Sequence, residues 1–179
     1  MSNQTAEMDL SGLEALLGGT LDAMADKPSW EVFPTGAHQC LMSMKLFQID
    51  IPALDAKGNK TNQKVKATGV KVTFKAIKTL ELAEPVGNED AAKELNPGDA
   101  NTVDLFFTHT SEMATRVGQG TFKEIAAKLN ERFGLRNNLE VIEQTQDVEV
   151  VLFCKRRAYV RKDTKELTHN LVIEQIELI

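Results

Sequence analysis

The alternation of apolar and polar residues limits what this chain can fold into more than any other feature of its sequence. A period of two is typical of a half-buried β-strand. In the first such segment, Cys40, Met42 and Met44 alternate with polar residues. Five segments show the pattern, and we expect strands at His38–Ile49, Lys64–Leu82, Thr102–Thr108, Asp147–Arg157 and His169–Leu178. The sequence therefore predicts a mostly β domain.

One segment between the third and fourth predicted strands follows a helical period instead. Its apolar residues recur three or four positions apart, at Phe122, Ile125, Ala126, Leu129 and Phe133. Gly134 follows them, at the position where a left-handed glycine commonly ends a helix. We expect the turn Gly118–Thr121 to begin this helix, and a short helix around Leu139–Glu143 to come after it.

The resulting order of strand, strand, strand, helix, strand, strand is that of an OB-fold-like five-stranded barrel. Such barrels bind oligonucleotides across strands 2 and 3 and through the adjoining loops. An SH3-like barrel and a small α+β sandwich are the alternatives, because strand order alone does not separate these folds.

Two details of the predicted strands indicate which side chains face outward. On the third strand we expect Leu105 inside and Phe106 outside. On the second strand the lysines change sides near Gly69, and a glycine within a long strand suggests a β-bulge. Phe74 shares a face with Val70 and is expected in the core.

The first 30 residues differ from the domain predicted for residues 31–179. They are acidic, and Ser11–Glu14 has the spacing of a capping box, which predicts a short leader helix. The acidic start has no basic region of the kind found in signal peptides, and no apolar run reaches the roughly 20 residues of a membrane helix. We therefore expect a cytoplasmic protein without membrane contact, in which Cys40 and Cys154 are reduced core thiols.

Positive charge is concentrated in two segments of a chain whose net charge is −5. Residues 57–78 contain seven lysines and no acidic residue, and residues 155–165 contain six basic residues and one aspartate. This asymmetry indicates a local surface for anions, although lysines on edge strands also discourage aggregation. With the aromatic residues beside them, these segments give our predicted nucleic-acid-binding residues: Lys64, Lys66, Lys71, Lys75, Lys78, Phe106, Lys155, Arg156, Arg157, Tyr159, Arg161 and Lys162.

The sequence offers little that is typical of catalysis. The three histidines fall in three different segments, the two cysteines are far apart, and there is no phosphate-binding glycine loop or nucleophile elbow. We therefore predict that the protein is not an enzyme and has no cofactor and no metal site. A hydrolase would need His109 or His169 beside a carboxylate in a pocket.

The chain resembles the OB-fold single-stranded DNA-binding proteins of tailed bacteriophages from about Phe33 to its C-terminus. Phe33-Pro34-Thr35-Gly36-Ala37-His38 is similar to the Pro-x-Gly-x-aromatic segment that leads into their first strand, with His38 in the aromatic place. Gly118-Gln119-Gly120-Thr121-Phe122-Lys123-Glu124-Ile125 and a closing hairpin with a charged turn add to the likeness. The chain departs from many DNA-coating proteins in ending on Ile176–Ile179 and not on an acidic tail.

The resemblance implies a protein that coats single-stranded DNA without sequence preference during phage replication and recombination, in the cytoplasm of the bacterial host. RNA as a ligand and a homo-oligomeric state both stay open. The acidic residues of segment 7–31 could recruit replication or recombination proteins in place of the missing tail. The alternative function is that of a phage virion component or host-factor interaction protein that uses the leader helix for contact.

Overall fold

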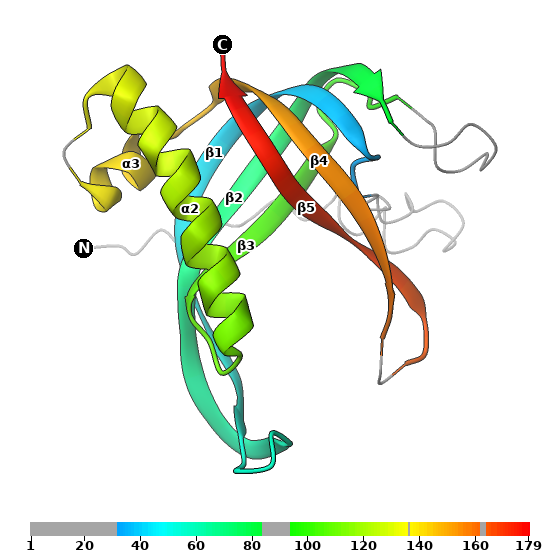
Figure 1. Ribbon diagram of the computed structural model, residues 1–179, viewed down its shortest axis with the longest axis vertical. Coiled ribbons are helices and arrows are strands. Elements are labelled where there is room, and N and C mark those ends of the chain that lie inside the picture. The colour runs from blue at the N-terminus through cyan, green and yellow to red at the C-terminus, as the bar shows by residue number, and fades with distance from the viewer. Residues whose placement is uncertain (1–31, 84–93, 136, 162–163) are drawn as a thin grey trace, which may run out of the picture. The chain divides into compact units, whose positions relative to one another are not determined.

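The structure is a computed structural model, and it describes residues 32–83, 94–135, 137–161 and 164–179 (Figure 1). The predicted leader helix and Lys162 lie outside the described residues. The predicted order of strands and helix is confirmed, and all strand pairs are antiparallel. The strands are β1 (Gly36–Leu54), β2 (Lys60–Leu82), β3 (Ala100–Thr108), β4 (Val148–Val160) and β5 (Leu167–Leu178), and the helices are α2 (Glu112–Phe133) and α3 (Asn138–Gln144).

The strands form one five-stranded sheet in the order β3-β2-β1-β4-β5. Its central strand, β1, pairs with β2 along most of its length, whereas β4 pairs only with the first part of β1, from Gly36 to Met42. The edge strands are β3 and β5. The mostly β prediction is thus confirmed as a curved antiparallel sheet.

Helix α2 starts six residues earlier than the sequence predicts. Its N-cap is Ser111, whose side chain accepts a hydrogen bond from the backbone amide of Ala114 at 3.3 Å. The predicted turn at Gly118–Thr121 is therefore wrong, because these residues lie inside the helix. The C-terminal prediction is confirmed: Gly134 has φ 65°, and its amide donates to the carbonyl of Asn130.

Two glycines of α2, Gly118 and Gly120, explain why the sequence predicts a turn within this helix. A Cβ on Gly118 would lie 2.4 Å from the backbone nitrogen and oxygen of Phe106, so this glycine lets the helix lie directly on β3. Gly120 faces open space. The apolar residues expected on one face are buried from Phe122 to Leu129. Phe133 is exposed at the helix end, where the Arg132 guanidinium lies 5.7 Å from its ring centroid.

Helix α2 contacts both edge strands of the sheet. The side-chain amide of Gln119 donates to the carbonyl of Phe107 on β3 at 2.9 Å, and the ammonium of Lys128 donates to the carbonyl of Ile176 on β5. The helix therefore satisfies backbone carbonyls on two strands that lie at opposite ends of the sheet order.

The core lies between α2, α3 and the concave face of the sheet. Its strand residues are those of the predicted apolar faces, including Cys40, Val70, Phe74, Leu105 and Leu152. The two cysteines are free and buried, and burial raises the pKa of Cys40 to about 12, with a further contribution from Cys154. The Cys40 thiol therefore stays protonated at neutral pH.

His38, the residue at the aromatic place of the resemblance, is fully buried against Phe33, with ring centroids 5.7 Å apart. Its Nε2 lies 2.8 Å from the carbonyl of Pro34, which can only accept, so this nitrogen carries the proton. Its Nδ1 then accepts from the Thr79 hydroxyl at 3.2 Å. The residue fixes the start of β1 in the core and is not available to a ligand.

Two hairpins project from the body of the domain, toward the lower part of the view in Figure 1. The β1–β2 hairpin extends past Thr68, where pairing of β2 with β3 ends. The β4–β5 hairpin extends past Cys154, where pairing of β4 with β1 ends. The pairing of β2 with β3 shifts register between Thr68 and Gly69, so an irregularity is present beside the glycine where the sequence predicts a bulge. The extra residue belongs to β3 and not to β2, because Thr68 pairs with Thr108 and Gly69 with Phe106.

Candidate nucleic-acid interface

Strand β2 presents its lysines on two different faces. Lys71, Lys75 and Lys78 are exposed on the outer face, opposite the core residues of the same strand. Lys78 keeps this side because a register shift between Gln39 and Cys40 places it opposite Gln39. Lys64 and Lys66 are also exposed, but they have the parity of core residues and lie on the projecting part of the hairpin.

The outer face carries a cluster of three rings, which we call the outer aromatic cluster: Phe47, Phe106 and His109. Phe47 on β1 and Phe106 on β3 are both in register with Gly69 on the strand between them. Because Gly69 has no side chain, the two rings meet edge to face over it, with centroids 5.4 Å apart. The His109 ring contacts Phe106 at 4.6 Å, and its Nδ1 accepts from the amide of Ser111 at 2.8 Å.

Lys71 joins this cluster to the lysine row of β2. Its ammonium lies 5.9 Å from the Phe47 ring centroid and 3.7 Å from a carboxylate oxygen of Asp104. Both partners of this ion pair are close to half exposed, so water screens it and it contributes little to stability. The lysine can therefore exchange Asp104 for a phosphate at small cost.

The second basic segment forms an arm of its own, which we call the β4–β5 arm: residues 155–161 of β4 and its turn, paired with residues 166–172. Arg157 and Tyr159 are exposed on one face, and Arg161 begins the turn, where its amide donates to the carbonyl of Glu166 at 2.9 Å. Lys155 shares their strand face but forms an ion pair with Glu174. Arg156 points to the opposite face and is only partly exposed.

The structure does not bring the predicted residues together as one patch in strand register. Those on the outer face and those on the β4–β5 arm form two surfaces, and Lys64 and Lys66 lie on neither of them. Strand β1 separates β2 from β4 in the sheet. Moreover, Arg157 lies beyond the last residue of β4 that pairs with β1, whereas Lys71 lies at the level of the core. The outer face of β1–β3 and the β4–β5 arm are therefore separate candidate contact surfaces.

Sequence reasoning missed two members of the outer aromatic cluster. A signal for Phe47 was present, because a large aromatic residue sits on the polar side of the first predicted strand, beside Lys45. His109 had no such signal, since it follows β3 and reaches Phe106 only through the turn into α2. Phe106 itself was predicted to face outward, and it does so.

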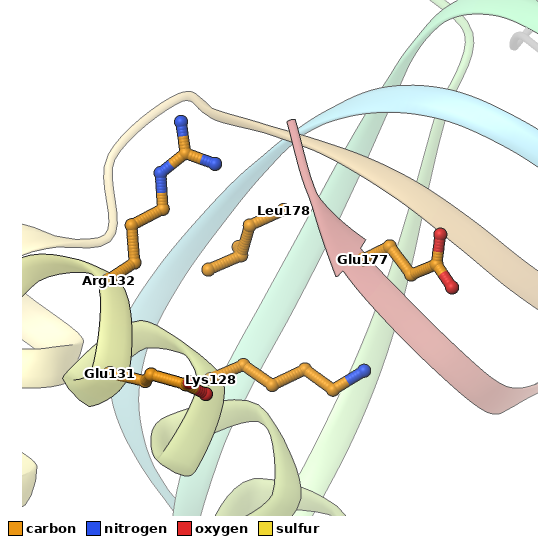
Figure 2. Close-up of a pocket in the computed structure, with 5 residues that line it drawn as sticks. All are labelled: Lys128, Glu131, Arg132, Glu177 and Leu178. Carbon is orange, nitrogen blue, oxygen red and sulfur yellow. The ribbon is translucent and has the colours of Figure 1, made fainter.

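A shallow pocket lies between α2 and the end of β5 (Figure 2). It is lined by Lys128, Glu131, Arg132, Glu177 and Leu178. Figure 2 shows the Lys128 side chain extending toward β5, while the Arg132 side chain leaves the same helix in a different direction. Two cations and two carboxylates give the pocket no preference for either sign of charge, so it does not compete with the basic surfaces as a site for an anion.

Two further observations bear on the type of protein. Within the described ranges, no three side chains of histidine, cysteine, aspartate or glutamate gather closely enough to hold a metal ion. Neither described helix has an apolar stretch long enough to cross a bilayer. Comparisons of the chain with protein-family models, curated proteins and solved structures find no match.

Proposed function

We propose that residues 32–179 form an OB-fold-like domain that binds single-stranded DNA without sequence preference, in replication or recombination of phage DNA. The strand order supports the fold, because in such a barrel strand 1 pairs with strands 2 and 4 while strands 3 and 5 form the seam. Here β3 and β5 are the edge strands, and both contact α2.

The observation that carries the proposal is the partly exposed pair Phe47 and Phe106 beside the lysine row of β2. Single-stranded nucleic acid is held by cations along its phosphates and by aromatic rings on which bases stack. Every base has a π-face and every nucleotide a phosphate, so this combination binds without reading sequence. Lys71 contacts both parts of the surface and would place a phosphate next to a stacked base.

A titration of the protein with a labelled oligothymidine at several salt concentrations tests the proposal. Each phosphate contact to single-stranded DNA contributes about −0.7 to the log–log slope of affinity against salt, so about five contacts give roughly −3 to −4. The double variant Lys71→Gln, Lys75→Gln should weaken binding to all sequences alike and reduce the magnitude of the slope by about 1.4.

Two controls sharpen this experiment. Lys123→Gln removes an exposed lysine from α2, away from the outer face, and should leave the slope unchanged. Phe106→Ala should cost about 1–3 kcal/mol of binding free energy through lost stacking while leaving the slope unchanged. Absence of binding at low salt, or binding that salt does not weaken, would contradict the proposal.

A further inference from the structure

The end of the β4–β5 arm carries an exposed apolar pair that the folded domain does not use. Val160 and Leu167 face each other directly across the two strands. Their exposed fractions are 57% and 65%. They lie at the end of the ribbon side that continues the core-facing row from Cys154, and Arg156 and His169 lie on the same side between the core and this pair.

The opposite side of the same ribbon has a different character. It carries Arg157 and Tyr159, with Tyr159 45% exposed and paired with Thr168. Arg161 and Lys165 add positive charge where the strands end, in a turn closed by the hydrogen bond from the Lys165 amide to the carbonyl of Arg161. The end of one side of the arm therefore fits a stacked apolar surface, and the other side fits a phosphate and a base.

We propose that the β4–β5 arm binds the junction between single-stranded and base-paired DNA. In this arrangement Val160 and Leu167 cover the last base pair, while Arg157 and Tyr159 hold the strand that leaves the duplex. The inference rests on the proposed function and adds to it a second ligand, the end of a duplex.

A wedge between two strands needs two unlike faces. The end of a duplex exposes the flat apolar surface of a base pair, and proteins that open base steps place aliphatic side chains against that surface. The departing strand exposes phosphates and an unstacked base, which cations and an aromatic ring bind. A two-stranded ribbon projecting beyond the sheet can present both faces at once, which a side chain inside the sheet cannot.

Two substrates with the same single-stranded length distinguish this inference from simple coating. One is an oligothymidine, and the other carries the same oligothymidine as an overhang next to a short duplex. Covering a base pair removes the apolar surface of the Val160 and Leu167 side chains from water. We therefore expect the full-length protein to bind the junction substrate about tenfold more tightly than the oligothymidine. Fluorescence anisotropy at fixed salt measures both affinities.

The double variant Val160→Thr, Leu167→Thr should lose this preference and keep the wild-type affinity for oligothymidine. Threonine preserves strand propensity, and the unchanged affinity also shows that the variant is folded. A matched control is Met113→Gln, Val117→Thr on α2, where the exposed fractions are 66% and 57%. The control should keep the tenfold preference, because it removes equally exposed apolar residues elsewhere.

The outcomes separate the two proposals. A protein that binds neither substrate contradicts the proposed function, whereas one that binds both equally contradicts only the junction site. A preference that survives in the Val160→Thr, Leu167→Thr variant would also overturn it. The junction site would also be contradicted if the wild-type protein showed no junction preference but sedimented with phosphatidylserine vesicles, and if the Val160→Thr, Leu167→Thr variant lost that sedimentation. The apolar pair would then bind a lipid surface.

Discussion

At the scale of single residues, the glycine at position 69 organises the candidate site. It allows Phe47 and Phe106 to meet across β2, and a Cβ there would lie 2.2 Å from the carbonyl oxygen of Leu105. One residue thus allows both the close approach of β3 to β2 and the contact between two rings. The aromatic surface depends on the absence of a side chain in its centre.

We predict that Gly69→Ala destabilises the domain by about 1–3 kcal/mol, because the new methyl group meets backbone and not a flexible side chain. Thr73→Ala on the same face of the same strand should cost less than about 1 kcal/mol. Urea denaturation followed by circular dichroism measures both. Equal free energies of unfolding for wild type and Gly69→Ala would show that β2 and β3 can separate locally without cost.

At the scale of the elements, α2 connects two strands that are distant in the sheet order. The approach of the helix to β3 requires Gly118, whereas Gly120, two residues further on, has nothing near it. The sequence presents these glycines as a matched pair, and only their surroundings in the structure distinguish them.

Opposite effects are expected for alanine at these two positions. Gly118→Ala should lower the free energy of unfolding by about 1–3 kcal/mol, since its Cβ would overlap the Phe106 backbone. Gly120→Ala should raise it by about 0.5–1 kcal/mol, since alanine loses less backbone entropy in a helix. Thermal melting of both variants checks the prediction, and a stabilising Gly118→Ala would mean that α2 does not lie against β3 as described.

At the scale of the whole molecule, the positive charge lies on a domain whose chain is acidic overall. Residues 1–30 contain Glu7, Asp9, Glu14, Asp22 and Asp26 against a single basic residue, Lys27. DNA binding as proposed uses only side chains of the outer face and the β4–β5 arm, none of which belongs to this segment.

Deletion of residues 1–28 should therefore leave the salt slope of oligothymidine binding within about 0.7, the contribution of one phosphate contact. The same titration used for the intact chain measures it. If the deletion abolished DNA binding, the outer face alone would be insufficient. If instead a protein partner were lost while DNA binding was never present, the interaction-protein function would be favoured.

The sequence by itself determined the order of the five strands and α2 and which side of most of them faces the core, although it placed the start of α2 too late. These features follow from local periodicity, and residues such as Val70, Phe74 and Phe106 point as their spacing predicts. It also located Gly134 as a helix end, because that depends on the conformation of one residue, and it indicated an irregularity beside Gly69 without showing that the extra residue belongs to β3.

Only the tertiary structure decided which of these residues meet. Phe47 and Phe106 are 59 positions apart in the chain and come together through the pairing of three strands, and Gly118 is a packing residue only because β3 passes beneath it. The two basic segments look equivalent in the sequence, yet one lies on the sheet face beside aromatic rings and the other on a projecting arm with an apolar pair. Strand pairing and sheet curvature are long-range properties, so no local pattern reveals them.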